Sequence, residues 1–242
     1  METLTRFLTP AGPCGYLPHE VWRLEYEIVQ SMSAEEYAER LLQGWRRFGH
    51  ALFRPRCAQC TACRSLRVEA AAFQPNRSQR RNERMNAGAV SLRLGTPTVS
   101  RAKLTLYDRF HAFQTESKGW PLHEPKDPES YVESFVLNPF TTEEWTYWLG
   151  SRLVGVGYVD AVPAGLSAIY FFYEPRERQR GLGTWNVLNC ISQARQRGLP
   201  HVYLGYYVAG CASLEYKATF RPNEAIDSSG AWAPFRTISP GG

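Results

Sequence analysis

The stretch from Arg152 to Tyr207 limits the fold of this chain more than any other part of the sequence. Two apolar, aromatic-rich runs, 153–159 and 166–173, flank a short turn that contains Pro163 and Gly165. Proline and glycine end strands and supply turns, so this pattern predicts an antiparallel β-hairpin. The hairpin is expected to form the centre of a sheet.

The segment after the hairpin contains a glycine turn. Gly181 and Gly183 precede a helical pattern predicted over 184–197, and a third strand is predicted over 201–207. This arrangement directs backbone N–H groups toward an anion, and glycine lets the backbone approach it closely. Residues 178–183 fit the R/Q-x-x-G-x-G/A loop of the acyl-CoA N-acyltransferase fold, in which the loop holds a pyrophosphate beside a splayed sheet. The alternative is an ordinary helix N-terminus with glycine for packing.

Positive charge is concentrated in one part of the chain. The 242 residues carry a net charge of +5. Residues 44–93 contain eleven arginines and no lysine, with Glu69 and Glu83 as the acidic residues. Arginine binds phosphate in a bidentate manner, so this segment suits nucleic acid better than general solubility. A solvated basic surface is the alternative.

A basic helix is predicted to begin within this segment, after Pro75. Its arginines recur at positions i, i+3, i+4 and i+7, which places them on one helical face. They are Arg77, Arg80, Arg81 and Arg84. Such a row is about two turns long and would contact successive phosphates or an acidic peptide end.

Cysteine spacing predicts a thiol site. Cys57, Cys60 and Cys63 follow a C-x2-C-x2-C pattern, and Cys14 lies in a rigid loop between two prolines. Four cysteines suffice for a tetrahedral zinc or a [4Fe–4S] cluster, and an arginine-rich environment favours the thiolate. Free thiols are the alternative, because a chain with no secretory signal keeps its cysteines reduced. The other two cysteines, at 190 and 211, are interpreted as structural.

Other elements follow from local patterns. Ser33 and Glu36 form a capping box that begins a helix expected to end near Gly49. Further predicted elements are strands over 22–29, 66–73 and 144–149, and helices over 103–117 and 128–137. Residues after 224 are expected to form a surface tail. A soft domain boundary is placed near residue 100, which gives domains 1–100 and 101–242.

Composition sets the remaining limits. Hydrophobic residues make up 43% of the chain, enough for a sizeable core. No apolar run reaches the roughly 18 residues of a membrane helix, and the N-terminus lacks the apolar core of a signal peptide. We therefore expect a soluble, cytoplasmic protein with no membrane partner.

Seven motifs are informative when taken together. They are Cys14-Gly15-Tyr16-Leu17-Pro18, Cys57-x2-Cys60-x2-Cys63, Pro75-Asn76-Arg77-x-Gln79-Arg80-Arg81, Asp160-x4-Gly165-Leu166-Ser167-Ala168-x-Tyr170, Leu182-Gly183-Thr184, Tyr203-Leu204-Gly205-Tyr206 and Tyr216-Lys217-Ala218-x-Phe220-Arg221-Pro222. Jointly they resemble the aminoacyl-tRNA–protein transferases, over about residues 10–225. The similarity is greater to the bacterial aspartate/glutamate leucyltransferase branch, and the eukaryotic arginyltransferases are its relatives.

The resemblance implies a fold and an activity. The fold is α+β, with an acyl-CoA N-acyltransferase-like (GNAT-like) C-terminal half and a smaller, cysteine-containing α+β N-terminal half. The activity moves Leu or Arg from charged tRNA to the α-amine of proteins that begin with Asp or Glu, in the N-degron pathway. Charged tRNA takes the place of coenzyme A, so no coenzyme A is expected.

Two other functions stay open. The loop over 178–183 has the two glycines of a coenzyme A loop, which keeps an acyl-CoA N-acyltransferase as one alternative. A non-catalytic, metal-stabilised RNA-binding module is the other. The cysteine spacing also differs from the adjacent cysteine pair of the eukaryotic enzymes, so zinc, an iron–sulfur cluster and free thiols all stay open.

The candidate site residues follow from the chemistry of aminoacyl transfer. The ester is already activated, so the enzyme must align and deprotonate an amine and stabilise an oxyanion. The catalytic candidates are Asp160, which would orient or deprotonate the amine, and Tyr170. The candidates for binding the acidic substrate residue are Arg77, Gln79, Arg80, Tyr206, Tyr216 and Lys217. The candidates for donating backbone hydrogen bonds to the tRNA 3′ end or the oxyanion are Gly181, Leu182, Gly183 and Thr184. A turn carboxylate for Asp160 and sheet packing for the tyrosines are the alternatives.

Overall fold

The computed structural model describes residues 1–235. The strands are β1 (Glu2–Leu8), β2 (Gly12–Pro13), β3 (Val21–Trp22), β4 (Leu24–Ser31), β5 (Arg46–Phe48), β6 (Ala51–Pro55), β7 (Arg64–Glu69), β8 (Val90–Gly95), β9 (Thr142–Leu149), β10 (Arg152–Val162), β11 (Gly165–Tyr173), β12 (His201–Tyr207), β13 (Asn223–Ile226) and β14 (Trp232–Pro234). The helices are α1 (Ala34–Leu42), α2 (Arg77–Asn86), α3 (Arg101–Lys118), α4 (Pro128–Tyr131), α5 (Leu182–Gln196) and α6 (Ala212–Glu215). Three short helices, η1 (Val132–Val136, π), η2 (Pro175–Arg180, 3-10) and η3 (Tyr216–Thr219, 3-10), complete the described part.

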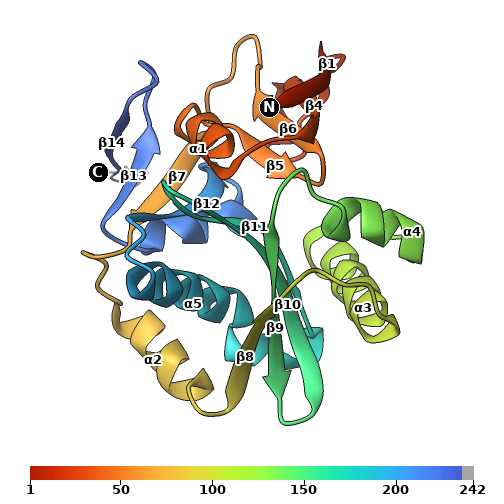
Figure 1. Cartoon of the computed structure of the whole chain (residues 1–242), viewed down its shortest axis with the longest axis vertical. Coiled ribbons are helices and arrows are strands. Elements are labelled where there is room, and N and C mark those ends of the chain that lie inside the picture. The colour runs from red at the N-terminus through yellow and green to blue at the C-terminus, as the bar shows by residue number, and fades with distance from the viewer. Residues whose placement is uncertain (236–242) are drawn as a thin grey trace.

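A large mixed sheet organises this α+β fold (Figure 1). Its strand order is β14-β13-β7-β12-β11-β10-β9-β8, and a second sheet has the order β1-β4-β6-β5. Helices α2 and α5 lie on one side of the large sheet, and α3 and α4 lie on the other (Figure 1). Strands β7 and β8, from the first hundred residues, thus share a sheet with strands from the rest of the chain. The division into two domains near residue 100 stays a prediction.

The predicted hairpin is confirmed. Strands β10 and β11 pair antiparallel, from Gly155 opposite Tyr173 to Val162 opposite Gly165. Strand β10 is buried on both faces, because α5 and α3 cover opposite sides of the sheet. A strand covered on both faces is continuously apolar rather than alternating, which explains the unbroken hydrophobic run in the sequence.

The predicted helix starts are confirmed by their caps. Ser33 and Glu36 form the expected capping box at the start of α1, and Asn76 with Gln79 forms a second one at the start of α2. The predicted end of the first helix was wrong. Helix α1 stops at Leu42, since the chain turns at Gly44 with a φ of 82° and continues as β5.

The expected surface tail was also wrong within the described residues. Residues 223–226 form β13, which pairs antiparallel with β7, and 232–234 form β14 at the edge of the large sheet. Apolar side chains explain the difference, because Ala225 and Phe235 join the core beneath these strands. The last part of the predicted tail, 236–242, lies outside the described residues. Among residues 1–235, no helix is long and apolar enough to cross a membrane.

Candidate active site at the splayed strands

The large sheet opens between β11 and β12. These parallel strands pair only at Leu166 opposite Val202 and Ser167 opposite Tyr203, near their starts. Beyond those residues β11 continues beside β10, while β12 continues beside β7. Backbone groups on the inner edges of two diverging strands no longer bond each other, so other groups can reach them. The candidate site is built around this opening.

Arg46 reaches this opening from β5. Its guanidinium donates to the Ser167 hydroxyl at 3.1 Å and to the Ala168 carbonyl at 2.5 Å, both on β11. On the β12 side it lies against Gly205, where an added Cβ would be 3.2 Å from Arg46 Nε. Gly205 has a φ of 78°, so glycine is needed there both for conformation and for space. The sequence prediction missed Arg46, because it placed this residue inside a helix.

The glycine turn at the start of α5 is fixed by α2. Asn82 donates to the carbonyls of Arg180 and Gly181, at 2.8 and 3.1 Å, and Asn86 donates to Arg180 at 2.9 Å. Gly181 is left-handed, with a φ of 59°, and a Cβ there would lie 2.6 Å from Asn82 Nδ2. A Cβ at Gly183 would meet no atom within 4 Å. The predicted anion turn therefore has one glycine packed on α2 and one that faces open space.

The arginines of α2 lie on the face away from these contacts. Arg77, Arg80, Arg81 and Arg84 are all exposed. Arg80 bonds the carbonyl of Pro75, and the other three form no ion pair within the described part of the chain. Because Asn82 and Asn86 on the opposite face of the helix bond the α5 turn, helix α2 and its arginines are held in a fixed position relative to that turn. This juxtaposition joins segments about one hundred residues apart.

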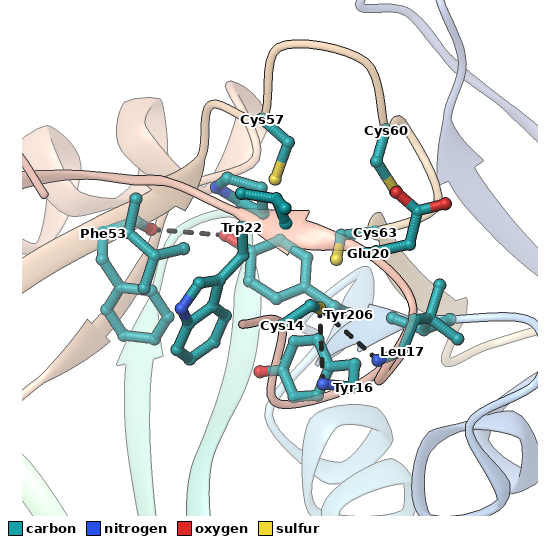
Figure 2. A pocket seen from close by; sticks show the side chains of 14 residues that line it. Cys14, Tyr16, Leu17, Glu20, Trp22, Phe53, Cys57, Cys60, Cys63 and Tyr206 are labelled. Carbon is teal, nitrogen blue, oxygen red and sulfur yellow. Dashed lines mark hydrogen bonds between the residues drawn. The ribbon is translucent and has the colours of Figure 1, made fainter. Parts of the chain in front are cut away.

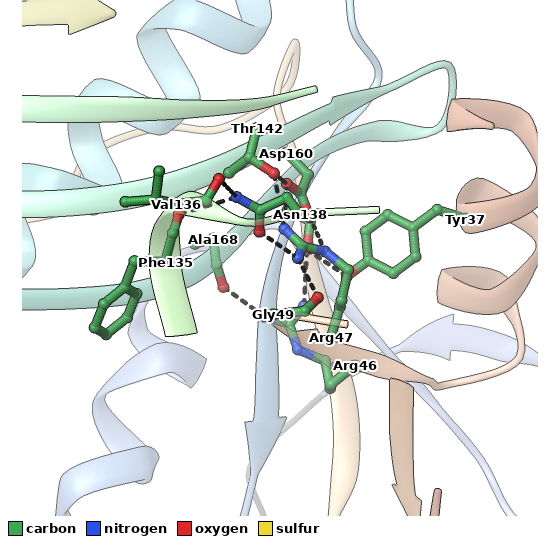
Figure 3. A network of polar contacts seen from close by, with 11 residues as sticks. Tyr37, Arg46, Arg47, Gly49, Phe135, Val136, Asn138, Thr142, Asp160 and Ala168 are labelled. Carbon is green, nitrogen blue, oxygen red and sulfur yellow. Dashed lines mark hydrogen bonds and ion pairs between the residues drawn. The ribbon is translucent and has the colours of Figure 1, made fainter. Parts of the chain in front are cut away.

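Asp160 lies in a buried polar network (Figure 3). Its side chain is 0% exposed, and its oxygens accept hydrogen bonds from Arg47 and from the Thr142 hydroxyl. No hydrogen bond joins Asp160 to another predicted site residue between positions 1 and 235. This placement on β10 favours a structural ion pair, and it differs from the turn carboxylate that was the alternative interpretation of Asp160.

The other predicted site residues lie in different surroundings. The Tyr170 hydroxyl is 2.9 Å from His111 Nε2, on the face covered by α3. Burial, followed by the neighbouring His123, lowers the pKa of His111 to about 4, so His111 is neutral near pH 7. Gln79 is buried and serves the α2 cap, and its amide also donates to the Thr219 carbonyl at 3.2 Å.

The tyrosines and the lysine of the final motifs surround the end of β12. The Tyr206 hydroxyl is buried and donates to the Gly44 carbonyl at 3.0 Å. Lys217 donates to the Tyr206 carbonyl at 3.0 Å. Tyr216 is 40% exposed and stands apart from that contact. The structure therefore brings Lys217 and Tyr206 together, whereas Arg77 and Arg80 lie on a separate helix.

Four cysteines from two segments line one small cavity of about 20 Å³ (Figure 2). They are Cys14, Cys57, Cys60 and Cys63. The Cys14 sulfur accepts hydrogen bonds from the N–H groups of Tyr16 and Leu17, both at 3.4 Å. The donor set suits a thiolate-bound metal. However, within residues 1–235 no three His, Cys, Asp or Glu side chains are already arranged as metal ligands.

The expected thiolate character is wrong for one of these cysteines. Burial, followed by the neighbouring sulfurs of Cys14, Cys57 and Cys60, raises the pKa of Cys63 to about 12. Surrounding arginines do not offset this, because they point into the adjacent open groove rather than into the cavity. Without a metal ion, Cys63 is therefore a neutral thiol near pH 7.

Comparison with known proteins identifies the family. Family models described as the N terminus and the C terminus of arginine-tRNA-protein transferase match residues 12–81 and 102–227. The chain belongs to this transferase family. The resemblance inferred from the sequence motifs is thus confirmed, and the protein is an aminoacyl-tRNA–protein transferase.

Relatives within this transferase family match nearly the whole chain. An aspartate/glutamate leucyltransferase of Campylobacter jejuni (strain 81-176) is 36% identical over 225 residues, which covers 91% of this chain and 92% of the relative. One from Halorhodospira halophila is 36% identical over 235 residues, which covers 94% and 96% of the two chains. Among solved structures, L-PGS from Bacillus licheniformis has a TM-score of 0.42 at 13% identity and covers 75% of this chain and 53% of its own.

Proposed function

We propose that this enzyme transfers leucine, or alternatively arginine, from charged tRNA to proteins that begin with Asp or Glu. Its relatives are named aspartate/glutamate leucyltransferases, and these names support acidic acceptors and a leucyl donor. The structural observation that carries the proposal is that Asn82 and Asn86 fix the arginine-bearing helix α2 against the α5 turn. The exposed α2 arginines offer guanidinium groups to a phosphate backbone, and the α5 turn offers backbone N–H groups to the 3′ end. In this scheme tRNA takes the place of coenzyme A, and the reaction takes place in the cytoplasm, where charged tRNA is found.

The reaction is placed at the opening between β11 and β12. We infer that the C-terminal half is GNAT-like. In support, the parallel strands β11 and β12 are connected through α5, and they diverge beside the glycine turn. The acceptor amine, once deprotonated, attacks the ester carbonyl of the aminoacyl-tRNA. A peptide bond forms, the ester C–O bond breaks, and the ribose hydroxyl leaves with a proton. Backbone N–H groups at Gly183 and Thr184 are suited to stabilise the oxyanion, because the first turn of a helix leaves them without intrahelical partners.

The four cysteines that line the cavity are proposed to hold zinc or a [4Fe–4S] cluster. Support comes from their shared cavity and from the two N–H groups that point at the Cys14 sulfur. When bound, such a group would fix the Cys14 loop to the Cys57–Cys63 loop. In this proposal the role of the four cysteines is to hold the two loops together.

One experiment tests the proposed transfer. Purified protein is incubated with Leu-tRNA or Arg-tRNA and with peptides that begin with Asp, Glu, Arg or Lys. We expect transfer only to the Asp and Glu peptides and only with charged tRNA, and the donor that works decides between leucyl and arginyl transfer. Consumption of an acyl thioester without use of charged tRNA would instead indicate acyl-CoA chemistry. Salt-sensitive tRNA binding without transfer would indicate an RNA-binding module.

A further inference from the structure

Three cationic side chains are buried in the described part of the chain, and one of them lacks an acidic partner. Arg47 pairs with Asp160, and Lys103 pairs with Glu144. Arg46 is 7% exposed, yet no carboxylate within residues 1–235 lies in ion-pair range of it. Its guanidinium donates to a hydroxyl and to a backbone carbonyl, which do not neutralise a full charge. A buried cation without a counter-charge is costly, so this site is suited to receive an anion.

A second cation lies beside the first. Lys217 donates to the carbonyl of Tyr206, the residue after the Gly205 that packs against Arg46. Burial, followed by the positive charge of Arg46, lowers the pKa of Lys217 to about 7, and only Cys211 acts in the opposite direction. Lys217 also forms no ion pair with any acidic residue of the described chain. Two cations therefore converge at β12 with no acidic residue between them.

The location of these cations identifies the anion. They lie at the opening between β11 and β12, where the acceptor amine has to arrive, and not on the exposed arginine face of α2. An open groove of about 640 Å³ is lined by Gly44, two residues before Arg46, and by Tyr206, whose carbonyl Lys217 contacts, although neither cation itself lines the groove. The groove is large enough for an extended peptide. A deeply placed guanidinium suits a small carboxylate at the end of a chain better than the backbone of an RNA duplex.

We propose that Arg46 and Lys217 together bind the side-chain carboxylate of the acceptor's first residue. This inference rests on the proposed function. It assigns the recognition of the acceptor's acidic side chain to Arg46 and Lys217 instead of Arg77 and Arg80. The groove then holds the rest of the acceptor chain, and the α2 face is left to tRNA. A neutral Asn or Gln at the first position of the acceptor would leave the two cations unpaired. The enzyme would then distinguish Asp and Glu from Asn and Gln by the cost of leaving desolvated cations unpaired, rather than by the shape of the side chain.

The test compares Arg46→Met and Lys217→Met with the wild type on peptides that begin with Asp and with Asn. Loss of one partner of a buried, hydrogen-bonded charge pair predicts a fall in kcat/KM of at least roughly 30-fold for the Asp peptide. The Asn peptide should keep its wild-type kcat/KM, so the Asp-to-Asn ratio collapses. Arg197→Met is the matched control. Arg197 is exposed, lies at the far end of α5 and pairs with Glu143, so its substitution should leave kcat/KM for both peptides unchanged.

The outcomes separate the inference from the proposed function. If the wild type does not modify the Asp peptide at all, the proposed function fails. If it does, but the variants keep the wild-type Asp-to-Asn ratio, the inference alone is overturned. Thermal melting checks folding, and Lys217→Met, at a partly exposed position, carries the test if Arg46→Met does not fold. Arg46→Lys, which keeps the charge, should retain more of the ratio than Arg46→Met.

Discussion

Arg47 binds both oxygens of the Asp160 carboxylate, with Nε 2.9 Å from Oδ2 and the second guanidinium nitrogen 2.7 Å from Oδ1 (Figure 3). The pair joins β5 to the C-terminal end of β10, and both side chains are almost fully buried. The same guanidinium donates to the Gly49 carbonyl at 2.6 Å and to Asn138 at 2.7 Å. Arg47 therefore ties the small sheet to the large one through a bidentate, desolvated contact.

Asp160→Asn is expected to destabilise the fold rather than to abolish a proton transfer. Removal of one partner leaves the Arg47 charge buried and unpaired, which predicts a loss of about 3–5 kcal/mol in the free energy of unfolding. Urea denaturation measures this loss. The double variant Arg47→Met/Asp160→Leu should recover part of it, because no isolated charge remains. Normal stability combined with loss of transfer would instead restore Asp160 as a catalytic residue.

Substitution of Arg77, Arg81 and Arg84 by alanine is expected to weaken tRNA binding without any loss of stability. All three are exposed and form no ion pair in the part of the chain described, so the fold does not depend on them. Each arginine that contacts a phosphate should lower the slope of log affinity against log salt by about 1. Arg197→Ala is the control, since Arg197 pairs with Glu143 and follows the C-terminal end of α5, away from the glycine turn. An unchanged salt slope in the triple variant would exclude the α2 face as the tRNA contact.

Local sequence patterns predicted the helices and strands better than they predicted which distant residues contact each other. Strand β12 has the predicted bounds, and the hairpin turn and the capping box of α1 lie where turn and cap residues placed them. The pairing of Arg47 with Asp160 spans 113 residues, and no periodicity in the sequence signals such a contact. The sequence analysis also missed the roles of Arg46 and Arg47 for a second reason. The helical pattern through Trp45 overran Gly44, although glycine after an apolar face is a recognised stop signal.

Gly181→Ala and Gly183→Ala are expected to have different effects. Alanine at Gly181 must adopt a left-handed conformation that costs roughly 1–2 kcal/mol, and its Cβ also displaces Asn82. Alanine at Gly183 meets no atom and replaces a poor helix former, so stability should rise by up to about 1 kcal/mol. Chemical denaturation measures both changes. If Gly183→Ala also lowers kcat with charged tRNA, a ligand must approach this backbone closely, whereas unchanged kcat contradicts the anion-turn role.

Purified protein is expected to contain zinc or iron bound through the four cysteines that line the cavity. Elemental analysis of protein prepared without oxygen gives the metal and its stoichiometry, and absorbance of an iron–sulfur cluster separates the two metals. Cys63→Ser should lose the metal, because its sulfur is surrounded by those of the other three cysteines. Cys190→Ala is the matched control, since Cys190 is buried against the large sheet beside α5. Metal-free protein with four titratable thiols would contradict the proposal.

Lys217 predicts a specific dependence of stability on pH. Its pKa is lowered from an ordinary 10.5 to about 7 in the folded protein, first by burial and then by Arg46. Between these two values the unfolded chain holds a proton that the folded chain lacks, so the free energy of unfolding rises with pH across this window. Lys217→Met removes the buried charge, and the variant should therefore exceed the wild type in stability below pH 7. That advantage should shrink as the pH rises from 7 to 10.5, and above that range the lysine is neutral in both the folded and the unfolded chain. Urea denaturation at pH 6, 7.5 and 9 measures the difference, and parallel profiles for the two proteins would show that Lys217 is not desolvated beside Arg46.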